Sequence, residues 1–103
     1  MRVELLYFDG CPSHEALLPR LLALLEEAGV EERVEVRRVE SPEAANAECF
    51  LGSPTLRVNG RDVEPGAAQR TDFGLKCRLY RTDAGLLGQP PAEWVASALN
   101  GCP

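Results

Sequence analysis

A cysteine and a histidine lie three residues apart in the segment YFDGCPSHE (residues 7–15) and could do chemistry together. The turn residues DG precede Cys11, and Pro12 suits the first turn of a helix. At such a helix end, the unpaired amides and the positive end of the helix dipole favour a thiolate and lower the pKa of Cys11. His14 would share its helix face. The same helix end disfavours a protonated imidazole, so a neutral His14 could accept the thiol proton or donate a hydrogen bond to the thiolate. We therefore expect Cys11 to be an exposed nucleophile.

Two other interpretations of Cys11 stay open. A free cysteine is among the most buried residue types, so Cys11 could simply pack in the core. Cys11 and His14 could also bind a soft metal ion such as Hg(II), Cu(I) or Zn(II), with Cys77 or Cys49 completing the site. A Cys-x-x-His pair alone is a weak signal for such a site, because closed zinc sites usually need four ligands.

The chain holds three further cysteines, Cys49, Cys77 and Cys102. Lys76 and Arg78 flank Cys77 and would favour a thiolate there if the residue is exposed. Cys49 precedes the GSPT segment and could approach Cys11, but burial on a short helix is equally compatible with its position. Cys102, in the tail, is expected to be incidental or an exposed thiol that is prone to oxidation.

The strands and helices around Cys11 can be predicted from hydrophobic periodicity. Residues 2–8 are almost continuously apolar, as in a strand whose sheet is covered on both faces. The helix that follows Cys11 should end at Gly29. Its apolar residues form one stripe at helical spacing, made of Leu17, Leu18, Leu21, Leu22, Leu25 and Ala28.

The segments after residue 31 carry further signals of strands, helices and turns. Apolar residues alternate with polar ones over residues 32–40, which is typical of a strand. Ser41 is a typical residue at the start of a helix, and Asn59-Gly60 is a strong hairpin signal. The elements predicted after residue 40 are a short helix at 41–50, a hairpin at 54–65, an irregular segment at 66–76, a short strand at 77–81, turns, and a helix at 91–99 with Trp94, Val95, Ala98 and Leu99 on its inner face. This order predicts one α/β domain over residues 1–103, with a mixed sheet of four to five strands sandwiched between helices.

Composition limits the classes of partner. The 103 residues carry a net charge of -5. Proteins that bind nucleic acids or anionic membranes usually have a basic surface, so this charge speaks against both partners. The segment MRVELLYF lacks the features of a signal peptide, and no apolar run approaches the roughly 20 residues that span a bilayer. We therefore expect a cytoplasmic protein with reduced thiols, no cofactor, and neither nucleic acid nor membrane as a partner.

Three spaced features of the chain resemble the thioredoxin-like superfamily. CPSH stands where that family has Cys-x-x-Cys, Pro19 lies eight residues after Cys11, and GSPTLRVNG resembles the family's cis-proline segment. The resemblance covers residues 3–64 well and implies a thioredoxin-like fold. It further implies that Pro54 is cis and faces Cys11, and that the backbone of Ser53 pairs with a thiol-bearing substrate. Pro12 and Ser13 are the other substrate-binding residues it implies.

His14 occupies the position of the family's second cysteine, so CPSH cannot resolve a mixed disulfide by itself. A small thiol such as glutathione could resolve it, as the resemblance to single-cysteine glutaredoxins suggests. Cys77, or failing that Cys49, could do so instead. In the remaining alternative, the thiolate of Cys11 binds a soft metal ion and takes no part in thiol–disulfide exchange.

The combination of FDGCPSHE, FLGSPTLRVNG and CRLYR also resembles small thioredoxin-like proteins associated with mercury-resistance gene neighbourhoods, some of them labelled alkylmercury lyases. Carbon–mercury cleavage needs paired thiolates and an acid that protonates the leaving carbon. The chain shows one plausible cysteine pair at best and no identified acid, so the residues do not support that label.

Three functions remain from the sequence. The first is a thioredoxin-like thiol–disulfide oxidoreductase or redox partner of monothiol type, in which Cys11 attacks a disulfide of a protein or small molecule, His14 tunes the attack and Cys77 resolves it. The second is a soft-metal protein of a metal-resistance system, with mercury, copper or zinc bound by Cys11 and His14. The third is an interaction module without turnover.

Overall fold

The computed structural model describes residues 1–100, so Cys102 lies outside the described residues. Strands and helices alternate through the first half of the chain, and a hairpin follows. The elements are β1 (Val3–Tyr7), α1 (Ser13–Glu27), β2 (Val34–Arg38), α2 (Pro42–Ala47), β3 (Thr55–Val58), β4 (Arg61–Asp62), the 3₁₀ turn η1 (Ala67–Gln69), β5 (Tyr80–Thr82), β6 (Gly85–Leu87) and α3 (Ala92–Leu99). This matches the predicted order of elements up to the last turn-rich segment, where β6 was missed.

The main sheet has four strands in the order β2-β1-β3-β4. Strand β1 runs parallel to β2, with Val3 opposite Val34, and antiparallel to β3, with Leu5 opposite Leu56. Strands β3 and β4 form the predicted hairpin. Asn59 and Gly60 have φ values of 54° and 80°, which is why the turn needs this residue pair. The structure is therefore mixed α/β, as the sequence predicts.

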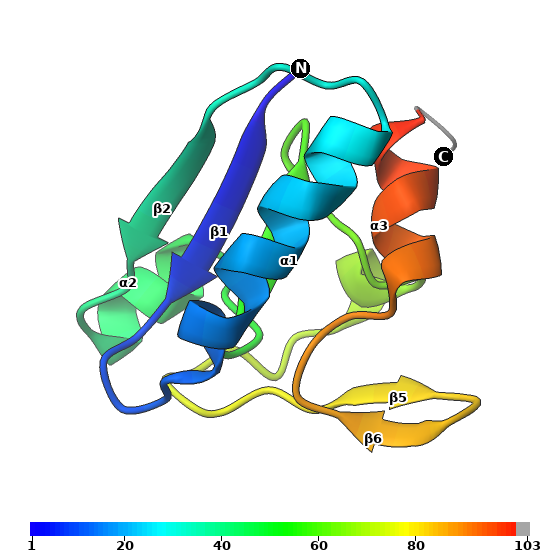
Figure 1. Cartoon of the computed structure of the whole chain (residues 1–103). Coiled ribbons are helices and arrows are strands. Elements are labelled where there is room, and N and C mark those ends of the chain that lie inside the picture. Colours follow the sequence, from blue (N-terminus) through cyan, green and yellow to red (C-terminus); the bar gives the residue numbers. More distant parts are fainter. Residues whose placement is uncertain (101–103) are drawn as a thin grey trace.

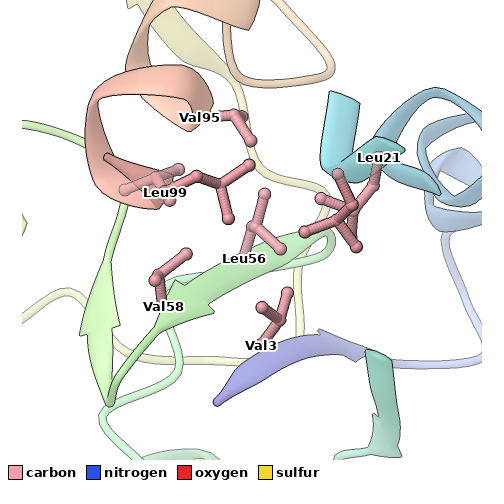
Figure 2. Packing of buried hydrophobic residues seen from close by; sticks show 8 residues of the cluster. Val3, Leu21, Leu56, Val58, Val95 and Leu99 are labelled. Atoms are coloured by element: carbon pink, nitrogen blue, oxygen red, sulfur yellow. The ribbon is translucent and has the colours of Figure 1, made fainter. Parts of the chain in front are cut away.

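Helices cover both faces of this sheet (Figure 1). One face packs against α1 and α3 through Val3, Leu56 and Val58, and Figure 2 shows these side chains meeting Leu21, Val95 and Leu99. The other face packs against α2, where Leu6 of β1 meets Ala45 and Phe50. Successive residues of a strand point to opposite faces, so Val3 and Leu6 belong to different clusters. The predicted sandwich is confirmed.

Helix α1 is positioned by a narrower stripe than the sequence suggests. Leu17, Leu21 and Leu25 are buried, but Leu22 is 50% exposed and Ala28 is also exposed, so both were wrongly assigned to the buried stripe. Leu21 and Leu25 pack in the same cluster as Val3, Leu56 and Val58 of the sheet, whereas Leu22 lies one step around the helix and faces away from that cluster. Gly29 ends the helix with φ of 70°, as predicted.

The second sheet was not predicted. In the described part of the chain, strands β5 and β6 pair only with each other, and they project beyond the main sheet at the lower edge of Figure 1. The segment predicted as a strand at 77–81 is divided between two partners: Cys77 bridges to Ser53, and the regular strand begins at Tyr80. Among residues 1–100, no helix is long and apolar enough to cross a membrane.

Candidate functional site

Cys11 lies in the turn between β1 and α1, two residues before the helix begins. Its backbone amide donates to the carbonyl oxygen of Phe8 at 3.3 Å. The residue is only 2% exposed, so the expectation of an exposed thiol at this position was wrong. Its Sγ atom lies 3.5 Å from Ser13 Oγ and 3.7 Å from the carbonyl oxygen of Ser53. The turn before α1 could be predicted from neighbouring residues. The burial of Cys11 could not, because it depends on segments that are distant in the chain.

The loop before β3 lies against Cys11 and is itself buried. The Ser53-Pro54 peptide bond is cis, as predicted, and its serine carbonyl is close to Cys11 Sγ. Gly52 has φ of 121°, and a Cβ atom there would lie 2.9 Å from the carbonyl oxygen of Lys76. Glycine is therefore required, because the backbone around Lys76 approaches so closely.

That approaching backbone belongs to the segment that carries Cys77. Cys77 forms a parallel bridge with Ser53. The amide of Ser53 donates to the carbonyl oxygen of Lys76 at 2.8 Å, and the amide of Arg78 donates to the carbonyl oxygen of Ser53 at 2.9 Å. The backbone groups that the resemblance assigns to substrate are therefore bonded to residues of the chain itself.

Side chains alternate along this segment. Arg78 and Tyr80 are buried, whereas Cys77 and Leu79 are exposed. Cys77 lies next to Cys11, because it pairs with Ser53, whose carbonyl oxygen is 3.7 Å from Cys11 Sγ. The structure thus brings together Cys11, Ser13, Ser53, Pro54 and Cys77, all of which the sequence predicts.

The two thiols differ in their tendency to lose a proton. Burial by itself raises the pKa of Cys11, but hydrogen bonds from Cys77 and Ser13 favour its thiolate and leave its pKa below the ordinary thiol value. The pKa of Cys77 is raised, because its proton is held in the hydrogen bond to Cys11 and because a second negative charge would be repelled there. The first proton is lost more readily than from a free thiol and the second less readily.

A buried arginine anchors the Cys77 segment, and sequence reasoning missed its role. The guanidinium of Arg78 donates to both carboxylate oxygens of Asp62, at 2.7 and 3.0 Å, and to Glu64 at 3.3 Å. It also donates to Thr55 Oγ1 at 3.0 Å. Its side chain is 1% exposed and lies over the ring of Tyr80, 4.4 Å from the ring centre. Only the alternation in CRLYR indicated that Arg78 and Tyr80 share a face.

Further contacts tie this segment to the loop of Pro54. The hydroxyl of Tyr80 donates to the carbonyl oxygen of Pro54. Thr55 Oγ1 donates to the carbonyl oxygen of Gly52 at 2.6 Å. Among residues 1–100, the buried polar atoms without a hydrogen-bond partner are Ser53 Oγ and Arg78 Nε. Both belong to the paired segments beside Cys11.

His14 is turned toward the backbone of Cys11. Its ring stacks on that of Tyr7, with centroids 4.0 Å apart and an interplanar angle of 17°. Its Nδ1 atom lies 3.2 Å from the carbonyl oxygen of Cys11. A carbonyl oxygen can only accept, so Nδ1 carries the hydrogen. A direct role of His14 at the thiol stays a prediction.

The other predicted residues lie around this pair. Pro12 is exposed next to Cys11. Cys49 is exposed just after α2 and is not among the groups that shift the pKa of Cys11. Within residues 1–100, no three His, Cys, Asp or Glu side chains gather in a way that could hold a metal ion.

No family model, curated protein or solved structure matches the chain. A thiol with a lowered pKa next to an exposed thiol is an arrangement that suits thiol–disulfide exchange.

Proposed function

We propose that this protein is a thioredoxin-like thiol–disulfide oxidoreductase or redox partner that works through Cys11 and Cys77. The proximity of these two cysteines, which both lie against Ser53, carries the proposal. The strand order, the strand directions and the cis bond at Pro54 beside Cys11 support the thioredoxin-like part of it. The lowered pKa of Cys11 supports the redox part, because it favours the thiolate that disulfide exchange needs.

The reaction would be a two-step exchange. One sulfur of the pair attacks a substrate disulfide, forms a mixed disulfide and releases a substrate thiolate. The other sulfur then attacks the mixed disulfide and releases the second substrate thiol, leaving a Cys11–Cys77 disulfide. Two protein thiols are oxidised and one substrate disulfide is reduced. Of the three routes left open by the sequence, this proximity favours resolution by Cys77.

A groove beside the site offers room for the substrate. It lies between α1 and the end of β6, has a volume of about 340 Å³, and is lined by Ser13, Ala16, Arg20 and residues 87–89. Arg20 donates to Gln89 Oε1 at 2.6 Å across it. Ser13 contacts Cys11 Sγ, so a substrate lying in this groove would be next to the thiol pair.

The test is oxidation of the reduced protein by glutathione disulfide, followed by peptide mapping. We expect a Cys11–Cys77 disulfide in the wild type and in Cys49→Ser, a matched control whose exposed thiol lies outside the pair. Catalysed reduction of a model protein disulfide should be lost in Cys11→Ser and in Cys77→Ser. Failure to form the internal disulfide, together with unchanged turnover in both variants, would contradict the proposal.

The proximity of Cys11 and Cys77 also favours a second candidate function, the binding of a soft metal ion as cargo. Two adjacent thiolates suit Cu(I) or Hg(II), which prefer soft sulfur ligands. Purified protein titrated with Cu(I) should then bind one ion per chain and lose that ion in either Cys11→Ser or Cys77→Ser. Retention of the metal by both serine variants would rule this candidate out.

A further inference from the structure

We propose that Cys77, rather than Cys11, is the thiol that attacks the substrate, and that Cys11 is the buried partner that resolves the mixed disulfide. This assignment rests on the proposed function and reverses the order expected from the CPSH motif. Two observations support it: Cys77 is exposed whereas Cys11 is buried, and hydrogen bonds and ion pairs hold residues 76–78 in place.

Access to the two sulfurs differs. Thiol–disulfide exchange requires the attacking sulfur to approach a sulfur of the substrate directly, so that sulfur must be open to solvent. Cys11 is 2% exposed and lies against Ser13 and the carbonyl oxygen of Ser53. Cys77 is exposed. A substrate therefore meets Cys77 first.

The backbone that would have to move to expose Cys11 is strongly held. Lifting residues 76–78 would break the two hydrogen bonds to Ser53. It would also pull Arg78 from Asp62 and Thr55, leaving a buried charge without its partners. Lys76 adds a contact to Asp72 at 3.0 Å. The segment is therefore held in place, and Cys77 is its exposed thiol beside Cys11.

The protons and electrons balance in this order. The starting pair is the Cys11 thiolate and the Cys77 thiol. Cys77 Sγ attacks one sulfur of the substrate disulfide, its proton passes to Cys11 Sγ, and one substrate thiolate leaves. Cys11 Sγ then attacks Cys77 Sγ and gives its proton to the second substrate sulfur, which leaves as a thiol. The two cysteines end as a disulfide, and the substrate disulfide is fully reduced.

The experiment uses the full chain with Cys49→Ser and Cys102→Ser, so that Cys11 and Cys77 are the remaining thiols. Ellman's reagent is the substrate, because each attack releases a coloured thionitrobenzoate ion. The parent should release two ions and end with the internal disulfide. Addition of Cys11→Ser should leave a stable adduct on Cys77, whereas addition of Cys77→Ser should slow the first release by about tenfold or more, because the remaining sulfur is buried.

A second measurement avoids dependence on the single-cysteine variants. The parent is treated with a small fraction of one equivalent of a glutathione thiosulfonate, quenched at once with acid and mapped by mass spectrometry. The first adduct should be on Cys77. If the parent forms the internal disulfide but the first adduct is on Cys11, and Cys77→Ser reacts as fast as the parent, this assignment is overturned while the proposed function stands. If no internal disulfide forms, both this assignment and the proposed function are contradicted.

Discussion

The backbone amide of Arg78 donates to the carbonyl oxygen of Ser53 at 2.9 Å, and the same oxygen lies 3.7 Å from Cys11 Sγ. One carbonyl group thus links the buried thiol to the segment that carries the exposed one. The side chain of Arg78 points the opposite way and is bound by Asp62 and Glu64. The segment that carries Cys77 is therefore anchored by an ion pair that lies away from the thiols.

Replacing this arginine should destabilise the protein and disturb the thiol pair. Arg78→Met leaves the carboxylate of Asp62 without its buried partner, so we expect a loss of about 3–5 kcal/mol in the free energy of unfolding. Arg78→Lys should lose less, because it keeps the charge but not the two parallel hydrogen bonds. Urea denaturation measures both.

Measuring the redox equilibrium of the two cysteines tests whether Arg78 positions Cys77 or only stabilises the fold. The equilibrium constant of the Cys11–Cys77 disulfide against glutathione should shift in Arg78→Met and partly recover in Arg78→Lys. Arg81→Met, at an exposed position on β5, is the matched control. An unchanged equilibrium constant in folded Arg78→Met would show that Arg78 does not position Cys77.

Gly52 should not tolerate a side chain. In Gly52→Ala the new Cβ atom would lie 2.9 Å from the carbonyl oxygen of Lys76 and 3.0 Å from Arg78 Cβ, at φ of 121°. We expect a loss of about 1–3 kcal/mol and faster alkylation of Cys11, because residues 76–78 are pushed outward. Gly66→Ala is the control: its φ is 82°, but nothing lies within 4 Å of the new atom. Equal alkylation rates in the two variants would contradict this account.

The thiol pair should make stability depend on pH near the ordinary thiol pKa, about 8.5. The folded pKa of Cys11 is lowered, so stability rises as pH increases from that folded value toward 8.5. The folded pKa of Cys77 is raised, so stability then falls as pH increases from about 8.5 toward that higher folded value. Under reducing conditions, the cysteine contribution to stability should therefore peak near the ordinary thiol value.

Denaturant titrations at several pH values check this dependence. Cys11→Ser should remove the peak, and Cys77→Ala should raise the pKa of Cys11 by removing its hydrogen-bond donor. The pKa can be followed by thiolate absorbance in the ultraviolet. A pKa of Cys11 that does not change in Cys77→Ala would show that the titration of one thiol does not affect the other.

His14→Ala tests whether the histidine acts on the thiol or on the fold. The ring stacks on Tyr7 and donates to the carbonyl oxygen of Cys11. We expect a loss of about 1–2 kcal/mol in stability and little change in the pKa of Cys11, because these contacts avoid the sulfur. His14→Phe keeps the stacking and should recover part of the stability. A clear rise in the pKa of Cys11 in both variants would support the direct role predicted from the sequence.

Much of the fold was predictable because its signals are local. The apolar run of β1, the start of α1 after Pro12 and the hairpin at Asn59-Gly60 each depend on a few neighbouring residues. The second sheet was missed because β5 and β6 are three residues long, and β6 is exposed throughout, so no burial pattern marks it. Leu22 was misplaced because the period of a helix does not indicate how wide its buried face is.

The sequence by itself determined that Cys11 follows a buried strand at the start of a helix, and it identified Cys77 as the first choice of partner. Only the tertiary structure decided that Cys11 is covered, that Ser53 already pairs with residues 76 and 78, and that Arg78 is held by Asp62. The physical reason is that burial, ion pairing and thiol coupling are properties of segments far apart in the chain. Their energies appear only when those segments meet, so no local pattern encodes them.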